Sequence, residues 1–152
     1  MPSLTPPTIG LLNGPNLDRL GQREPQIYGY TTLDSIETSL RAKAQKAGYQ
    51  FKSFQSNHEG ALIDTLWTWH DDGVKGVILN PVGLCHTSIS LHDAIAGINI
   101  PVIEVHLSNI YEREEFRRKS LTALACKECI TGFGAVGYDM ALEALLKLLP
   151  VT

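Results

Sequence analysis

Short apolar runs alternate with helical patterns along this chain, and the runs stop at polar turn residues. Strands are predicted where apolar residues stand together or alternate with polar ones, over 9–12, 49–54, 76–79, 101–105 and 129–133. Helices are predicted where apolar residues recur at helical spacing, from Thr31 or Thr32 to about Lys46 and over 60–69, 88–96 and 136–149, with a charged helical turn or two over 112–118. The chain is therefore expected to alternate strands with helices throughout.

Almost wholly apolar strands that alternate with helices form parallel sheets covered on both faces. The pattern thus predicts an α/β fold: a flavodoxin-like, doubly wound, five-stranded parallel sheet in a single domain. We expect this domain to span 8–150, after a short disordered lead-in over 1–7. Thr31 and Asp34 resemble a capping pair for the first helix. The residues expected to share the core face of the second helix are Leu62, Ile63, Leu66 and Trp67.

Composition and charge narrow the range of partners. Hydrophobic residues make up 43% of the 152 residues and charged residues 19%, which is ordinary for a globular domain. The net charge of −3 argues against nucleic acid, because phosphate binding favours a basic surface. No apolar run approaches the roughly 20 residues needed to cross a bilayer, so no membrane partner is expected. The first residues lack a signal-peptide pattern and the three cysteines suit a reducing compartment, so we expect a cytoplasmic protein.

Cys126 and Cys129 have the C-x-x-C spacing of a redox or half-zinc site. The pair precedes a strand-like run instead of opening a helix after a strand, and a second ligand pair at matching spacing is absent from the sequence. Structural cysteines are the favoured interpretation. His86, His106 and Glu104 form only a weak set of metal ligands, so neither a metal nor another cofactor is expected.

Polar side chains gather where each predicted strand ends. In an open parallel sheet the carboxyl ends of the strands meet along one edge, where ligands bind. The residues at this edge are Asn13 and Asn16 after the first strand, 55–59 after the second, Asn80 with 86–88 after the third, and Glu104, His106, Ser108 and Asn109 on and after the fourth. Any one cluster can consist of turn and capping residues. The four together indicate a site for a polar small molecule.

The segment 23–29 adds a candidate base. A free tyrosine phenol has a pKa of about 10 and is a poor base at neutral pH. A guanidinium nearby stabilises the phenolate, so Arg23 would make the oxygen of Tyr28 a usable proton acceptor. Pro25 and Gly29 allow a defined loop that presents both groups. Taken alone, the segment is equally compatible with a surface loop in which the two side chains never meet.

Glu104 and His106 add a candidate acid. Residues i and i+2 of a strand point to the same face, so the carboxylate can contact the imidazole and favour its protonated form. A buried pair that serves only the structure is as compatible with this spacing. A phenolate base and an imidazolium acid together suit proton abstraction beside a carbonyl, with loss of a hydroxyl as water.

These segments, in this order, resemble type II 3-dehydroquinate dehydratase over about residues 9–145. The matching blocks are 12–17, Gly21, 23–25, 28–29, 55–60, 80–81, 86–88, 104–109 and 113–117. The resemblance implies a flavodoxin-like subunit, usually in a dodecamer of trimers. It implies the conversion of 3-dehydroquinate to 3-dehydroshikimate by anti elimination through an enolate, without a cofactor, in the shikimate pathway or in quinate breakdown.

By position, the resemblance also implies roles for individual residues. Tyr28 would be the base, activated by Arg23, and Asn16 would hold a water against the enolate oxygen. His106 would protonate the leaving hydroxyl, oriented by Glu104. Substrate-binding roles are implied for Asn80, His86, Leu107, Ser108 and Arg117, and for Asp93, which would reach the site of a neighbouring subunit.

Two alternatives stay open at this point. One is an FMN-binding or phosphoacceptor domain of the same fold, although residues 13–16 are Asn-Gly-Pro-Asn where an FMN site needs a Ser/Thr-rich phosphate loop. The other is an inactive binding or scaffold protein built on the enzyme fold. The presence of Tyr28, Arg23 and His106 argues against the second alternative.

Overall fold

The computed structural model describes residues 5–150 of the chain and confirms the predicted fold. Within these residues, five parallel strands form one sheet in the order β2-β1-β3-β4-β5. The strands are β1 (Thr8–Asn13), β2 (Gln50–Gln55), β3 (Gly76–Asn80), β4 (Val102–His106) and β5 (Glu128–Thr131). The direction of winding reverses between β1 and β3, and in open α/β sheets ligands bind in the crevice outside the carboxyl ends of the strands at such a point.

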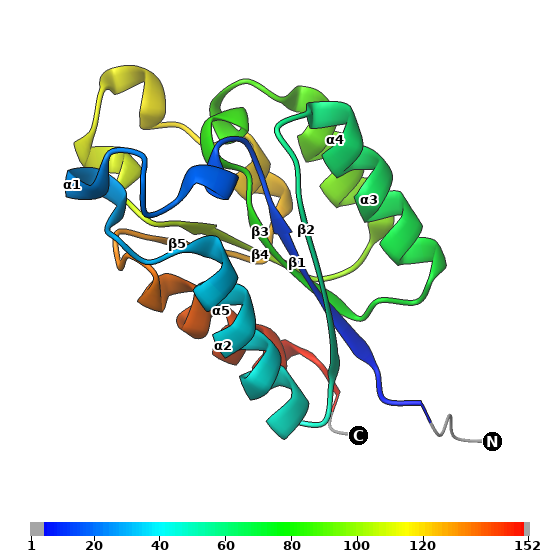
Figure 1. Cartoon of the computed structure of the whole chain (residues 1–152). Helices are drawn as coiled ribbons and strands as arrows, with labels where there is room; N and C mark the ends of the chain where they lie inside the picture. Colours follow the sequence, from blue (N-terminus) through cyan, green and yellow to red (C-terminus); the bar gives the residue numbers. More distant parts are fainter. Residues whose placement is uncertain (1–4, 151–152) are drawn as a thin grey trace.

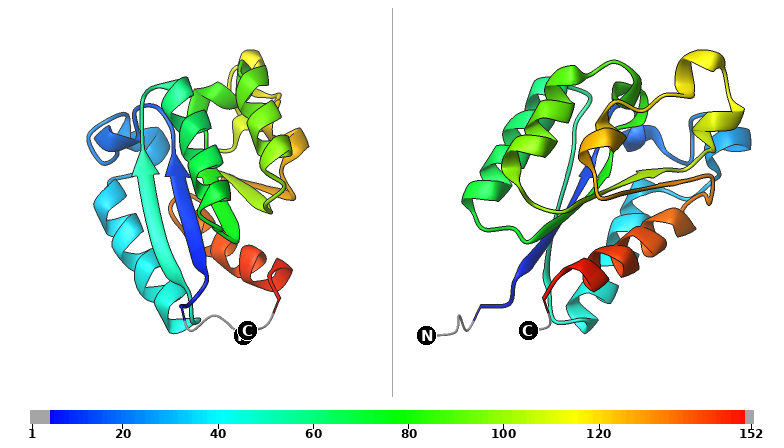
Figure 2. Two further views of the ribbon diagram at one scale, coloured as in Figure 1. Left: turned by 90° about the vertical axis from the view of Figure 1, so that its right-hand side faces the viewer. Right: turned by 180° about the vertical axis from the view of Figure 1, so that it is seen from behind.

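Helices cover both faces of the sheet (Figure 1). One face carries α2 (Leu33–Lys46) and α5 (Val136–Leu148), and the other carries α3 (Glu59–Asp71) and α4 (Ile89–Ile98), as the right-hand view of Figure 2 shows. The loop after β1 contains a single helical turn, α1 (Pro25–Tyr28). Short 3-10 turns occur in this loop and in later connections, at Leu17–Arg19, Val82–His86, Ile110–Glu112, Glu115–Arg117 and Thr122–Ala125. The charged turns predicted over 112–118 correspond to the third and fourth of these.

Successive side chains of β1 point into two apolar cores, one on each face of the sheet. Leu11 packs in the core under α2 and α5, Leu12 packs in the core under α3 and α4, and both are fully buried. Burial of one such leucine stabilises the fold by about 1.5–3 kcal/mol. This interior strand is thus fixed from both sides, and with it the position of Asn13 at its carboxyl end.

The predicted cap of the first helix was wrong by one residue. Thr32, whose backbone is extended, is the N-cap of α2, and its hydroxyl accepts a hydrogen bond from the N–H of Ser35 at 3.2 Å. Thr31 and Asp34 do not form the expected pair, because α2 begins at Leu33 and the capping geometry places the side chain immediately before it over the first turn.

The predicted core face of α3 was also partly wrong. Leu62 and Leu66 are fully buried, but Trp67 is 41% exposed and Trp69 is only 5% exposed. Trp69 fits against the sheet because Gly10 of β1 has no side chain, since a Cβ there would lie 2.4 Å from the Trp69 ring. A close approach between a strand glycine and an indole ring cannot be deduced from helical periodicity alone.

The domain bounds predicted over 8–150 stay a prediction, and the structure describes the chain on either side of the first bound only from residue 5. Of the lead-in predicted over 1–7, residues 1–4 lie outside the described residues, and the Pro7 carbonyl accepts a hydrogen bond from the Gln50 N–H at 2.8 Å. The first strand begins at Thr8. Among the described helices, within 5–150, none is long and apolar enough to span a bilayer.

Candidate active site

A pocket lies beyond the carboxyl ends of β1, β3 and β4, where the strand order predicts a crevice. Its walls come from segments far apart in the sequence: the loop after β1 with α1, the turn after β3, the end of β4, and the 3-10 turns that follow β4. The predicted site residues that line it are Asn16, Arg23, Tyr28, Asn80, His86, His106, Leu107, Ser108 and Arg117. The fold therefore brings the candidate base and the candidate acid to one place.

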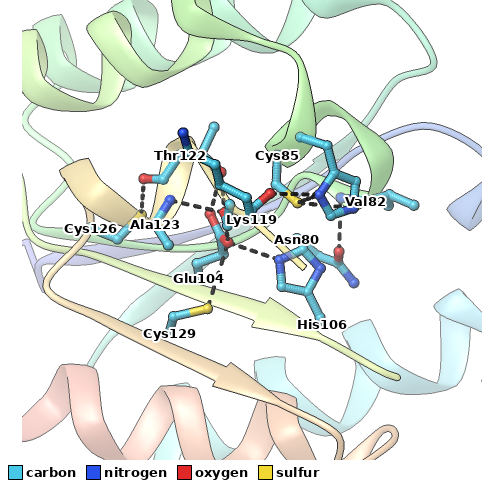
Figure 3. Close-up of polar contacts among 12 residues, drawn as sticks. Asn80, Val82, Cys85, Glu104, His106, Lys119, Thr122, Ala123, Cys126 and Cys129 are labelled. Atoms are coloured by element: carbon cyan, nitrogen blue, oxygen red, sulfur yellow. Dashed lines mark hydrogen bonds and ion pairs between the residues drawn. The ribbon is translucent and has the colours of Figure 1, made fainter. Parts of the chain in front are cut away.

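The β4 side of the pocket is a buried hydrogen-bond network around Glu104 (Figure 3). Glu104 is fully buried, and Nε2 of His106 lies 2.8 Å from its Oε2. The Ser120 hydroxyl donates to the same oxygen at 2.6 Å, and the Thr122 hydroxyl donates to Oε1. The carboxylate is thus held in one position and holds the imidazole in turn, which confirms the contact predicted from the i, i+2 spacing on the strand.

Glu104 carries its negative charge although it is buried. Burial by itself disfavours the charged form of a carboxyl group. The hydrogen bond and charge of His106, together with the hydroxyls of Ser120 and Thr122, outweigh burial and hold the pKa of Glu104 below its ordinary value of 4.5. Glu104 is therefore a carboxylate at neutral pH and places a negative charge beside the imidazole of His106.

A second chain of hydrogen bonds orients Asn80 at the floor of the pocket. The Val82 N–H donates to Oδ1 of Asn80 at 3.1 Å, and Nδ2 of Asn80 donates to the Tyr138 hydroxyl at 2.9 Å. Tyr138, fully buried on α5, donates in turn to Oδ1 of Asn13 at 2.7 Å. Val82 has a φ of +53°, which is strained for a β-branched residue. These hydrogen bonds therefore fix the direction of the Asn80 amide and stabilise the strained turn at Val82 in the pocket wall.

On the loop side, Arg23 and Tyr28 do meet. The Arg23 guanidinium carbon lies 4.8 Å from the centroid of the Tyr28 ring, and its Nη2 lies 3.4 Å from a carboxylate oxygen of Glu24. The single turn α1 brings them together: Pro25 is its first residue, and Gly29, with a φ of +85°, ends it. This helical turn was not predicted, because four residues are too few to show a periodicity.

The phenol oxygen of Tyr28 is bonded by a residue that the sequence analysis did not select. Nη1 of Arg113 donates to it at 2.8 Å and to the Ser108 hydroxyl at 3.3 Å. Arg23 thus contacts the face of the ring, whereas Arg113 also donates a hydrogen bond to the phenol oxygen. The one sequence signal for Arg113 is its place in the matching block 113–117, since 85 positions separate it from Tyr28.

Asn16 and His86 are held at the pocket by neighbouring groups. Asn16 has a φ of +71°, and its N–H donates to Oδ1 of Asn57 at 2.9 Å. Nδ1 of His86 lies 2.8 Å from the carbonyl oxygen of Lys119. A carbonyl oxygen can only accept a hydrogen bond, so this nitrogen carries the proton and the orientation of the ring is defined.

Arg117 and Asp93 differ in their relation to the pocket. Arg117 lines it, and its Nε donates to the Glu114 carboxylate, a hydrogen bond that holds the pKa of Glu114 below its ordinary value. Asp93 lies on α4 with its side chain 71% exposed, 3.0 Å from Nδ1 of His92, and outside the lining of this pocket. Its predicted role, at the site of a neighbouring subunit, stays a prediction.

Known proteins resemble this chain over almost its whole length. A family model described as dehydroquinase class II matches residues 7–146. A 3-dehydroquinate dehydratase of Bacillus cytotoxicus is 55% identical over 141 residues, which covers 91% of this chain and 94% of that protein. One of Sinorhizobium medicae is 53% identical over 143 residues, which covers 93% and 95%. The crystal structure of a type II dehydroquinase from Butyrivibrio crossotus has a TM-score of 0.90 and 39% identity, covering 92% of this chain and 97% of that one.

Proposed function

We propose a mechanism for this chain, which belongs to the class II dehydroquinase family and dehydrates 3-dehydroquinate in the shikimate pathway. The reaction is an anti elimination through an enolate, with Tyr28 as the base and His106 as the acid. One observation carries the proposal. Both groups line one pocket, and each has a partner of the charge that its role requires: the Arg113 cation on the phenol oxygen and the Glu104 anion on the imidazole. Opposite partners separate the proton affinities of a base and an acid in the direction that elimination needs.

The first step is removal of a proton from the ring carbon beside the ketone. The phenolate oxygen of Tyr28 takes this proton, and the electron pair of the broken C–H bond moves to the ketone oxygen to give an enolate. Arg113 favours the phenolate before the step through its hydrogen bond, and Arg23 adds positive charge at the ring face. Asn16, through a water molecule, would stabilise the charge that develops on the enolate oxygen.

The second step is loss of the hydroxyl. The enolate re-forms the ketone, its electrons form the new carbon–carbon double bond, and the C–O bond breaks. The leaving oxygen takes a proton from His106 and departs as water. With Nε2 of His106 bonded to Glu104, the other ring nitrogen would deliver this proton. Tyr28 has gained one proton and His106 has lost one, and exchange with solvent resets both.

The remaining polar groups would bind the substrate. Arg117 would pair with the substrate carboxylate, exchanging its contact with the exposed Glu114 for a more enclosed one. The ring hydroxyls would be bound by Asn80, His86 and the backbone N–H groups of Leu107 and Ser108. The fixed direction of the Asn80 amide supports this assignment, because a preoriented donor binds with less loss of entropy.

We also propose that the protein forms a homo-oligomer, a dodecamer of trimers, and that it is located in the cytoplasm. Ile89 on α4 is 66% exposed, and Asp93 on the same helix is exposed and does not line the pocket of its own chain, which supports a contact with another subunit through α4. The odd number of cysteines supports a reducing compartment. The mass of the purified protein in solution and the activity of Asp93→Ala test the assembly, and an active monomer would contradict it.

The decisive experiment follows the absorbance of the enone product after 3-dehydroquinate is added. Tyr28→Phe keeps the ring and removes the base, so we expect a loss of turnover of roughly 10²- to 10⁴-fold or more. Tyr30→Phe is the matched control, since Tyr30 is 79% exposed and lies two positions away. Normal turnover by Tyr28→Phe would remove the phenol from the mechanism.

His106→Ala tests separately whether Tyr28 acts in the first step and His106 in the second. In deuterated water, this variant should still exchange the ring proton with solvent to some extent, because the base is intact, while product formation falls by roughly 10²- to 10⁴-fold. An equal loss of exchange and elimination would contradict the assignment of His106 to the second step.

A further inference from the structure

The mechanism leaves one buried thiol beside the catalytic pair without a role. Cys85 is fully buried in the 3-10 turn Val82–His86, and its Sγ lies 3.3 Å from Nδ1 of His86 (Figure 3). The N–H of Leu121 donates to the Cys85 carbonyl at 2.7 Å, which fixes this turn against the segment that carries the Glu104 ligands Ser120 and Thr122. The position of the thiol is therefore set by the same packing that builds the acid side of the site.

Cys85, Glu104 and His106 form a compact set of metal-binding groups. One sulfur, one carboxylate oxygen and one ring nitrogen from these three buried residues all lie within 4.8 Å of one another. In a tetrahedral zinc site, with bonds of about 2.0–2.3 Å, neighbouring ligand atoms are roughly 3.3–3.8 Å apart. Small side-chain movements would therefore bring the three atoms around one ion.

The chemistry of the three groups selects a thiophilic divalent cation. Thiolate sulfur and imidazole nitrogen favour zinc and its heavier relatives over magnesium or calcium, which prefer oxygen ligands. A thiolate and a carboxylate together carry two negative charges, which a divalent cation neutralises inside the protein. His106 also lines the pocket, so a cation has a route from solvent to the cluster.

We propose that Zn²⁺ or Cd²⁺ binds Cys85 Sγ, the Glu104 carboxylate and Nε2 of His106, and that this binding inhibits the dehydratase. The cation displaces the proton of the Cys85 thiol and the proton on Nε2 of His106, and both are released to solvent. The imidazole then keeps only the proton on its other ring nitrogen, and the ion takes the place of the hydrogen bond between Glu104 and His106. Inhibition follows because His106, bonded to the ion through one nitrogen, can no longer be held as an imidazolium. The binding is independent of the proposed mechanism, whereas the inhibition rests on the proposed role of His106.

An inhibitor fits this cluster better than a resident cofactor does. Glu104 already accepts hydrogen bonds from His106, Ser120 and Thr122, so its charge is satisfied by protein groups and an ion must compete with them. We therefore expect that a chelator leaves the activity of the purified enzyme unchanged and restores the activity of enzyme that has been treated with Cd²⁺.

The test uses Co²⁺ for binding and Cd²⁺ for inhibition, on the full-length protein and on three variants, in which Cys85, Cys126 or Cys129 is replaced by serine. Co²⁺ bound to a thiolate gives a ligand-to-metal charge-transfer band in the near ultraviolet, which reports binding whether or not the enzyme turns over. Cys85→Ser removes the thiolate. Cys126→Ser is the matched control, because the Cys126 thiol donates to the Thr122 carbonyl at 3.3 Å and is outside the cluster.

The unaltered chain and Cys126→Ser should both show the band and lose activity with Cd²⁺. Cys85→Ser should lose the band, and its half-inhibiting Cd²⁺ concentration should rise by more than about tenfold, since even outer partners of metal ligands contribute about 10- to 100-fold to affinity. Each inhibition curve is scaled to the variant's own activity without metal. Circular dichroism checks the fold, and Cys85→Ala replaces Cys85→Ser if the latter does not fold.

Two results would overturn the proposal. One is an unchanged band and unchanged inhibition in Cys85→Ser. The other is loss of both in Cys129→Ser while Cys85→Ser keeps them, because the Cys129 thiol also contacts Glu104, at 3.6 Å from Oε2, and would then be the true ligand. A clear Co²⁺ band with Cys85-dependent affinity but no inhibition would confirm the binding and reject the inhibitory role assigned through His106.

Discussion

The acid side of the pocket is buried in a network of hydrogen bonds, whereas the base side lies part-exposed on one helical turn. Glu104 and His106 belong to an interior strand of the sheet, and the carboxylate has hydrogen-bond partners at both of its oxygens. Arg23 and Tyr28 lie on a loop, where the Arg23 side chain is 33% exposed and its ion-pair partner is the exposed Glu24. Exposed ion pairs of this kind contribute little, about 0–1 kcal/mol.

The strand side of the pocket is therefore fixed, whereas the loop side can adjust. The strand side has its geometry before any ligand arrives, because the sheet and the buried network determine it. The loop side depends on the hydrogen bond from Arg113 to the phenol oxygen and on two guanidinium groups stacked on the Tyr28 ring. Contacts between a bound substrate and the loop can therefore fix the position of Tyr28, whereas Glu104 and His106 are already in position.

The sharpest test of the loop side removes its bond to the phenol oxygen. Arg113→Met keeps an unbranched apolar stem and loses the guanidinium. Hydrogen bonds to charged groups contribute about 1.5–3 kcal/mol, so we expect kcat to fall roughly 10- to 100-fold. Arg118→Met is the control, since Arg118 is exposed and does not line the pocket. An unchanged kcat would mean that Arg23 alone supports the base.

The strand side is tested through Tyr138, which orients the Asn80 amide. Tyr138→Phe leaves Nδ2 of Asn80 and Oδ1 of Asn13 buried without their present partner, which should lower the free energy of unfolding by about 1–3 kcal/mol. Turnover should fall only a few-fold, mainly through a higher KM, because Asn80 binds and does not react. Urea unfolding and steady-state kinetics measure the two effects. Tyr111→Phe, at a tyrosine that is 52% exposed, should leave both unchanged.

The smallest expected effect concerns the stability of the acid side at low pH. The folded-state pKa of Glu104 lies below its ordinary value of 4.5, so the stabilisation is fully present above pH 4.5 and is lost as the pH falls through the folded-state value. Within that window the unfolding free energy of the unaltered protein should fall by up to about 1.4 kcal/mol per pH unit from this group alone. Glu104→Gln has no such titration, so its curve of unfolding free energy against pH should be flatter there. Parallel curves for the two proteins would show that the network does not favour the charged carboxyl.

Much of this arrangement could be predicted where the evidence lies within one element. The i, i+2 spacing of Glu104 and His106 on a strand was enough to predict their contact, because alternate side chains of a strand share a face. The same reasoning was wrong at Trp67, since the space that a glycine in another strand leaves for Trp69 does not influence the periodicity of α3. The matching blocks selected most of the pocket lining, but they did not separate Arg113 from its charged neighbours.

The sequence by itself determined the alternation of strands and helices, the edge of the sheet at which polar groups gather, and the pairing of the acid with its carboxylate. Only the tertiary structure decided which cation bonds the phenol oxygen, which tyrosine orients Asn80, and that Cys85 lies beside the catalytic pair. The physical reason is one of range. Periodicity reports contacts within a helix or strand, whereas these contacts join groups that lie on different elements and meet only after the sheet and its connecting turns have packed.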